Sequence, residues 1–284
     1  MTELTHESTQ RELATDNGVL RYHEAGEGPP LLLLHGSGPG VTGWRNFKGN
    51  LGVFAEHFHT YILEFPGFGV SDDTDLHPMM AALPAVTDFL DGLGIDKVDI
   101  IGNSMGGIVG TNFAMQSPDR LGKLVTIGGM GVAMNVPSPA EGINLLVDFT
   151  ANPTRDGLIR WLQSMVYDQS MITEELIEER WALATEPATL EFSKRMYNKA
   201  AMSAPPAADR PPYWSMLHTI KAEVLLTWGR DDRVSPVDMA TLPMRMIPNA
   251  ELHVLPKCGH WAMIEQKERW EAAVLSFLLR PPLT

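Results

Sequence analysis

Short, continuous apolar runs recur along this chain, and they constrain its fold more than any other feature. Such runs are typical of strands buried on both faces, as in a parallel sheet. They are Leu31–Leu34, Tyr61–Leu63, Val98–Ile101, Leu124–Ile127 and Val224–Thr227. Between them lie segments with apolar residues every three or four positions, such as Met80–Leu93 and Met105–Gln116, which predict helices. This alternation predicts an α/β fold with a doubly wound, mostly parallel sheet.

The alternation stops after Gly131, and strand signals resume only at Glu223. Helical patterns fill the interval at Gly157–Tyr167, Thr173–Ala184 and Leu190–Lys199. A chain of 284 residues suits one large α/β domain with an insertion. We therefore expect a core made of residues 1–135 and 214–284, interrupted by a helical cap at residues 136–213.

The segment Gly102-Asn-Ser-Met-Gly106 matches the motif G-x-S-x-G. It follows a predicted strand and opens a predicted helix, which is the context that this motif requires in an α/β-hydrolase. The glycines permit a sharp turn that bulkier residues do not tolerate. The alternative is an ordinary Gly-Ser turn. In the predicted context, we interpret Ser104 as a catalytic nucleophile.

A serine hydroxyl needs a base, and the fold expects the chain order serine, acid, histidine. Asp231 and Asp232 follow the strand that ends near Trp228, and His260 follows a strand predicted over Leu252–Leu255. Both sites lie past the carboxyl end of a strand, where an open α/β sheet builds its site. His260 is therefore the predicted base, and either aspartate could orient it.

The loop His35-Gly-Ser-Gly-Pro-Gly40 ends the first buried strand. In this fold that loop supplies one backbone N–H of the oxyanion hole, and the residue after the nucleophile supplies the other. We assign these two donors to Ser37 and Met105.

The charge balance bears on which partners the chain can have. The chain carries 22 Lys plus Arg against 35 Asp plus Glu, a net charge of −13. A surface of this sign repels nucleic acid and anionic membranes. It does not exclude an anionic small substrate, since one Arg in a cleft can reverse the local field. The sequence also has no metal-ligand spacing and no dinucleotide-binding fingerprint, so we expect no metal and no organic cofactor.

Cysteine usage and the first residues indicate a compartment. Cys258 is the only cysteine, so no internal disulfide can form. The segment Met1–Asp16 has no basic start followed by an apolar run, and no apolar stretch is long enough for a bilayer. We therefore expect a cytoplasmic protein without a membrane partner.

Taken together, these motifs resemble the meta-cleavage product hydrolases, the C–C bond hydrolases of aromatic ring catabolism, over nearly the whole chain. The similar segments are His35–Gly40 with Trp44 and Asn46-Phe47, Gly102–Gly107, Gly229–Arg233, Cys258–Trp261, and in the cap Met165–Asp168 and Glu179–Trp181. Generic esterases share the Ser, Asp, His order but rarely this set of flanking residues. The resemblance, with the expected reach of the loop, favours Asp232 over Asp231 as the acid.

The resemblance implies further roles. Arg180 becomes the cap residue that meets the substrate's carboxylate and 2-oxo group, with Asn46 and Asn103 around the same end and Trp261 beside the dienoate. From the sequence alone Arg180 is a solvated helix residue, since Glu178 and Glu179 precede it. Asn46 and Asn103 could equally be turn and capping residues.

The activity implied by the resemblance is hydrolysis of the C5–C6 bond of a 2-hydroxy-6-oxohexa-2,4-dienoate by a homodimer or larger homo-oligomer. The alternatives are a carboxylesterase or lactonase with the same Ser104–Asp232–His260 triad, and a non-catalytic ligand receptor. One departure from the family pattern is Glu64, where many relatives carry Asp. We expect Glu64 to be structural.

Overall fold

The protein is described by a computed structural model of residues 3–283, apart from residues 70, 73, 75, 134–137 and 201–211. The expected boundary between residues 135 and 136 lies outside the described residues. No helix in the described part of the chain is long and apolar enough to cross a membrane.

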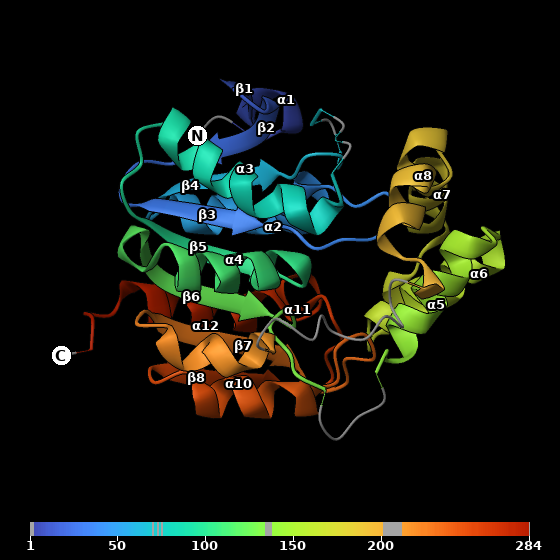
Figure 1. Cartoon of the computed structure of the whole chain (residues 1–284). Helices are drawn as coiled ribbons and strands as arrows, with labels where there is room; N and C mark the ends of the chain where they lie inside the picture. The colour runs from blue at the N-terminus through green and yellow to red at the C-terminus, as the bar shows by residue number, and fades with distance from the viewer. Residues whose placement is uncertain are drawn as a thin grey trace.

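An eight-stranded sheet forms the centre of the molecule, in the order β1-β2-β4-β3-β5-β6-β7-β8 (Figure 1). Neighbouring strands from β4 to β8 are parallel, whereas β2 is antiparallel to both β1 and β4. The strands are β1 (Gln10–Thr15), β2 (Gly18–Ala25), β3 (Pro30–Leu34), β4 (His59–Glu64), β5 (Val98–Asn103), β6 (Leu121–Ile127), β7 (Glu223–Gly229) and β8 (Ala250–Leu255). The expected fold class, a mostly parallel α/β sheet, is confirmed.

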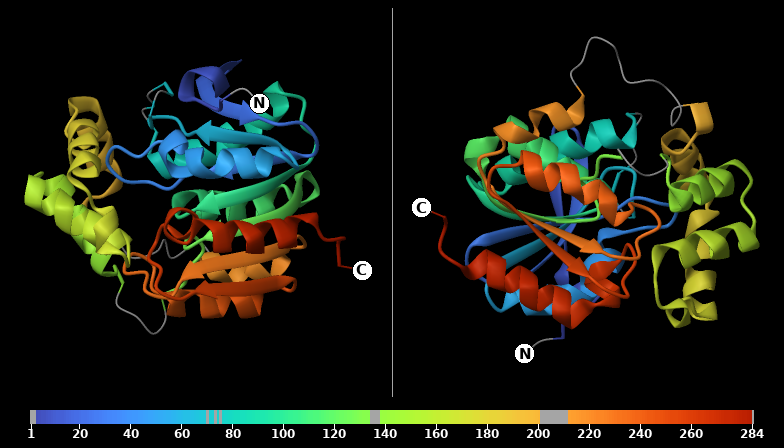
Figure 2. Two further views of the ribbon diagram at one scale, coloured as in Figure 1. Left: turned by 180° about the vertical axis from the view of Figure 1, so that it is seen from behind. Right: turned by 90° about the horizontal axis from the view of Figure 1, so that it is seen from below.

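Helices cover both faces of this sheet (Figures 1 and 2). One face carries α2 (Gly43–Ala55), α11 (Ala262–Glu265) and α12 (Lys267–Leu279), and the other carries α3 (Pro78–Gly92), α4 (Met105–Gln116) and α10 (Thr241–Met246). Successive strand residues point to opposite faces, so Leu31 and Leu33 join one core while Leu32 and Leu34 join the other. Two separate cores explain why the central strands, such as β3, are apolar throughout.

Between β6 and β7, the described part of the chain forms four further helices, which lie beyond the carboxyl ends of the parallel strands (Figure 1). They are α5 (Glu141–Ala151), α6 (Arg155–Met165), α7 (Glu174–Ala184) and α8 (Pro187–Met196). Thr154 and Thr173 start α6 and α7 by accepting a hydrogen bond from a backbone N–H of the first turn. These four helices are called the cap below.

The hairpin of β1 and β2 and the helix α5 are not among the elements expected from the sequence. The helix α3 begins two residues earlier than predicted, because Pro78 suits the first helical turn. Over the residues that the structure describes, the remaining short elements are α1 (His6–Thr9) and 3₁₀ turns at Pro118–Arg120, Gln169–Met171, Tyr213–Thr219 and Val237–Ala240.

Candidate active site

Ser104 lies at the turn between β5 and α4, with φ 50° and ψ −113°. A non-glycine residue in this region costs about 1–3 kcal/mol and persists only where its surroundings hold it. The Ser104 N–H donates to the Ile127 carbonyl at 2.8 Å, and the Ser104 carbonyl accepts from the Ile108 N–H at 3.1 Å. The turn also needs close backbone approach, since a Cβ on Gly106 would lie 2.1 Å from the Leu34 carbonyl oxygen. The strained turn therefore holds Ser104 at the carboxyl end of β5.

The loops after β7 and β8 bring Asp232 and His260 together. His260 Nδ1 lies 2.7 Å from Asp232 Oδ2, and both side chains are buried. The other carboxylate oxygen, Oδ1, accepts the N–H groups of Val234 and Ser235, each at 2.8 Å. A carboxylate only accepts, so the imidazole proton sits on Nδ1 and Nε2 is left free to act as a base.

Asp231, the other predicted candidate for the acid, has a different environment. Its carboxylate forms an exposed ion pair with Arg230 at 3.2 Å, and its N–H donates to the Cys258 carbonyl at 2.9 Å. Cys258 is fully buried beneath this loop. Of the two aspartates, Asp232 is therefore the one that contacts the histidine.

The loop after β3 is fixed by His35, whose Nδ1 donates to the Gly36 carbonyl at 2.6 Å and whose Nε2 accepts from the Phe65 N–H at 3.0 Å. Burial lowers the pKa of His35 to about 4, so the ring is neutral and suits this pattern. The Gly36 N–H is engaged by Asn46 Oδ1 at 2.8 Å. A Cβ on Gly36 would lie 3.3 Å from Ser104 Cβ, so the loop passes directly beside the serine.

Asn103 and Glu64 have identifiable contacts. Asn103 is buried, and its Nδ2 donates to the Ile127 carbonyl at 3.2 Å.

Glu64 accepts the N–H groups of Gly43 and Trp44 at 2.8 and 3.0 Å, so it caps the start of α2. Burial raises the pKa of Glu64 to about 7, although these two hydrogen bonds oppose the rise. Glu64 thereby positions α2, as expected of a structural residue.

Arg180 is buried on α7 and only 4% exposed, so its interpretation as a solvated helix residue is wrong. Its guanidinium carbon lies 5.4 Å from the ring centre of Trp161 and 5.9 Å from that of Trp261. Within the described residues no carboxylate forms an ion pair with it, and its Nε has no hydrogen-bond partner. Burial, and to a lesser degree the charge of Arg45, lower the pKa of Arg180 to about 10.

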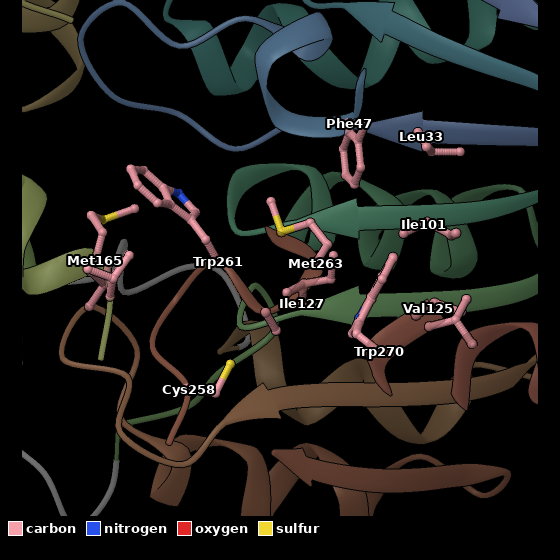
Figure 3. Close-up of a cluster of buried hydrophobic side chains, with 14 of the residues drawn as sticks. Leu33, Phe47, Ile101, Val125, Ile127, Met165, Cys258, Trp261, Met263 and Trp270 are labelled. Atoms are coloured by element: carbon pink, nitrogen blue, oxygen red, sulfur yellow. The ribbon is translucent and has the colours of Figure 1, made fainter. Parts of the chain in front are cut away.

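A pocket of about 130 Å³ opens beside this guanidinium and is also lined by Asn46 and Trp261. Trp261 lies at the end of the buried cluster that runs from the sheet toward the cap, near Met165 (Figure 3). Because Asn46 bonds Gly36 and Trp261 follows His260, the pocket adjoins the segments that carry the serine and the histidine. This arrangement can hold an anion beside the segments that carry Ser104 and His260.

The cap is joined to the histidine loop by backbone hydrogen bonds. The His260 N–H donates to the Met165 carbonyl at 2.7 Å, at the end of α6. Glu265 links the same two segments, because it accepts from the N–H groups of Gly259 and Tyr167 at 2.5 and 2.7 Å. These bonds form a seam between the end of α6 in the cap and the histidine loop of the core.

Sequence reasoning missed Tyr197, Trp161 and Glu265. The hydroxyl of Tyr197, just after α8, is hydrogen-bonded to Ser37 Oγ, and burial raises the pKa of this phenol. An aromatic residue at the end of a cap helix carries no signal that separates this contact from ordinary core packing. A Glu in the first turn after His260 likewise looks like a surface residue.

The described residues contain no group of three or more His, Cys, Asp or Glu side chains that could hold a metal ion. The chemistry in view is that of a hydroxyl, an imidazole with its carboxylate, and a buried guanidinium.

Residues 31–273 match the model of the alpha/beta hydrolase family. The chain belongs to the α/β-hydrolase family. It is 38% identical to a 2-hydroxy-6-oxo-6-phenylhexa-2,4-dienoate hydrolase of Burkholderia cepacia, over 98% of this chain and 99% of that protein. It is 41% identical to a 2-hydroxy-6-oxononadienedioate/2-hydroxy-6-oxononatrienedioate hydrolase of Burkholderia vietnamiensis, over 92% and 91%.

A solved structure agrees with these relatives. The meta-cleavage product hydrolase of Pseudomonas fluorescens IP01 matches this α/β-hydrolase with a TM-score of 0.85 and 26% identity, over 96% of this chain and 98% of that one. Within the α/β-hydrolases, the chain therefore belongs with the meta-cleavage product hydrolases, and the resemblance inferred from its motifs is confirmed.

Proposed function

We propose that this enzyme hydrolyses the C5–C6 bond of a 2-hydroxy-6-oxohexa-2,4-dienoate to 2-hydroxypenta-2,4-dienoate and a carboxylic acid. Full-length relatives that act on such dienoates support the reaction class. Their names differ in the group on C6, a phenyl ring in one and a carboxylate-bearing chain in the other. The proposal therefore concerns the shared dienoate end of the substrate.

The observation that carries this proposal is the buried guanidinium of Arg180, which has no carboxylate partner among the described residues. A buried cation without a carboxylate partner is costly, so its retention favours a role in binding an anion. A guanidinium can hold a carboxylate through two parallel hydrogen bonds. A dienoate presents such a carboxylate at the end remote from its scissile carbonyl, whereas a simple ester does not.

In the proposed reaction His260 first carries a proton to C5, which converts the dienol to the 2-oxo form. Ser104, deprotonated by His260, then attacks the C6 carbonyl, or His260 activates water for the same attack. The backbone N–H groups of Ser37 and Met105 hold the oxyanion that forms on C6. Asp232 keeps the imidazole in the tautomer that leaves Nε2 available.

The C5–C6 bond then breaks, and its electron pair moves through the C3–C4 double bond to the oxygen on C2. Negative charge develops at that oxygen, within the region that we assign to Arg180, Asn46 and Asn103. Trp261 flanks the planar dienoate. Water supplies the hydroxyl of the carboxylic acid product, and its proton goes to the dienol.

We propose that residues 136–213 act as the cap that closes over the substrate, on a core of residues 1–135 and 214–284. We also propose that the enzyme works in the cytoplasm as a homodimer or larger homo-oligomer. The single, buried Cys258 fits a reducing compartment. Light scattering on a gel-filtration column tests the assembly state.

A spectrophotometric panel tests the function. Ring-cleavage dienoates with alkyl, phenyl, bicyclic and carboxyalkyl groups on C6 are coloured, and hydrolysis bleaches them. We expect turnover of at least one dienoate with a kcat/KM far above that for p-nitrophenyl acetate. Hydrolysis of esters or lactones without any dienoate turnover would contradict the proposal and assign the triad to an esterase.

A further inference from the structure

The pocket beside Arg180 has an unusual charge for this protein. The chain as a whole carries a net charge of −13, yet the pocket is lined by Arg45, Lys48 and Arg180 against one acid, Glu179. A local excess of cations on an acidic protein attracts small anions specifically to that place.

The lining residues divide into an inner and an outer set. Arg180, Asn46 and Trp261 are buried and adjoin the catalytic segments. Lys48 is exposed, and the side chain of Arg45 is 24% exposed. The pocket therefore extends from solvent to the buried guanidinium, with cations at both ends.

Arg45 stands at the junction of core and cap. It lies on α2 of the core and forms an ion pair with Glu179 on α7 of the cap, the residue just before Arg180. Its charge also reaches inward, since it helps to lower the pKa of Arg180. Lys48 lies one helical turn further along α2, on the same side as Arg45. An anion that approaches this mouth meets two core cations, one of them held by a carboxylate of the cap.

We propose that Arg45 and Lys48 form an outer capture site for the substrate's carboxylate, from which the carboxylate passes to Arg180, and that Glu179 competes with the arriving anion for Arg45. This inference rests on the proposed dienoate function and adds the route by which the anion is recruited. It gives the Arg45–Glu179 pair a role in binding rate as well as in holding the cap to the core.

The test is the dependence of kcat/KM on ionic strength. The Debye length falls from about 30 Å at 0.01 M to about 3 Å at 1 M, so an attraction acting over about 10 Å operates at the first and vanishes at the second. At 0.01 M we expect Arg45→Gln to lower kcat/KM for a dienoate about two- to threefold, and Arg45→Gln with Lys48→Gln about fivefold. Arg45→Lys should retain the wild-type value. Glu179→Gln should raise it about twofold.

Arg120→Gln is the matched control. Arg120 is 29% exposed, pairs with one acid, Asp91, and precedes β6 at the end of the sheet opposite the cap (Figure 1). The variant Arg120→Gln changes the net charge by the same amount as Arg45→Gln, so an effect of total charge on kcat/KM would appear in both variants. With the wild-type enzyme, kcat/KM for uncharged p-nitrophenyl acetate should not vary with salt.

The outcomes are distinct. Convergence of the Arg45 and Glu179 variants on the wild-type value at 1 M, with opposite effects at 0.01 M, supports the capture site. Dienoate turnover that is independent of salt, or equal losses in Arg45→Gln and Arg120→Gln, overturns the capture site and leaves the proposed function standing. A wild-type enzyme that turns over no dienoate overturns both.

Discussion

Replacing Arg180 with Met should make the free protein more stable and the enzyme much weaker. Methionine is similar in length and apolar, so it fills the space between Trp161 and Trp261 without a charge. A residue that serves stability cannot show this combination, because its removal would lower both quantities. The substitution therefore separates a binding role for Arg180 from a structural one.

The magnitude follows from the burial of the guanidinium. A pKa of about 10 in place of 12.5 corresponds to about 3 kcal/mol of penalty on the charged form. The cation–π contacts with the rings of Trp161 and Trp261 offset about 1–2 kcal/mol of that penalty. The net destabilisation that remains is about 1–2 kcal/mol, and its removal should raise the Tm of Arg180→Met by about 2–4 °C.

The loss in activity is expected to be larger. Removing one partner of a buried charge pair costs about 2–4 kcal/mol, which lowers kcat/KM for a dienoate roughly 30- to 1,000-fold. Part of this loss should fall on kcat, because charge increases at the C2 oxygen during the reaction. Hydrolysis of p-nitrophenyl acetate should change little, since that ester has no carboxylate to place.

The assay combines thermal unfolding of the ligand-free proteins with steady-state kinetics on both substrates. Arg180→Lys is the control that keeps the charge, and it should recover only part of the activity because an ammonium cannot copy the bidentate geometry. A lower Tm together with equal losses on dienoate and ester would refute the reasoning and make Arg180 a structural residue.

Three further outcomes are expected. Ser104→Ala should lower dienoate turnover on the order of 10⁴-fold or more, and near-normal turnover would remove it as nucleophile. Asp232→Asn should cost about as much, whereas Asp231→Asn should be mild, and the reverse result would reassign the acid. The pKa of Glu64 is higher in the folded state, so the free energy of unfolding should fall as pH rises from about 4.5 through 7. Between pH 5.5 and 8, Tm should therefore drop less in Glu64→Gln than in wild type, and parallel profiles of Tm against pH would contradict this.

The parallel strands could be predicted because burial on both faces leaves an unbroken apolar run, and Leu31–Leu34 falls within one residue of the observed β3. Apolar runs do not predict the hairpin of β1 and β2, because β1 is largely polar and lies at an edge of the sheet. A signal is present, since the dipeptide Asn-Gly is common in hairpin turns, and here the turn is Asp16-Asn17 with Gly18 opening β2. The helix α5 also carries a signal, since its apolar residues recur at helical spacing.

Site residues could be predicted from the sequence where a motif fixes the local geometry, and could not be predicted where their position depends on packing against distant segments. The turn around Ser104 requires the glycines beside it, so the sequence motif predicts the turn. The burial of Arg180 depends on Trp161 and Trp261, which come from other segments. The two acids that precede Arg180 instead predict a solvent-exposed helix face. The contact of Tyr197 with Ser37 joins residues 160 positions apart, and no local pattern marks it.

The seam between α6 and the histidine loop has a consequence for how this enzyme can diverge. The bond from the His260 N–H ends on the main-chain carbonyl of Met165, so exchanging the side chain at position 165 leaves it in place. Adding or removing one residue there would shift the carbonyl and displace the imidazole. By contrast, Phe192 of α8 meets Phe68 of the core through side chains only. The end of α6 can therefore accept substitutions but not changes in length, whereas the contacts of α8 and Tyr197 with the core depend on which side chains stand at those positions.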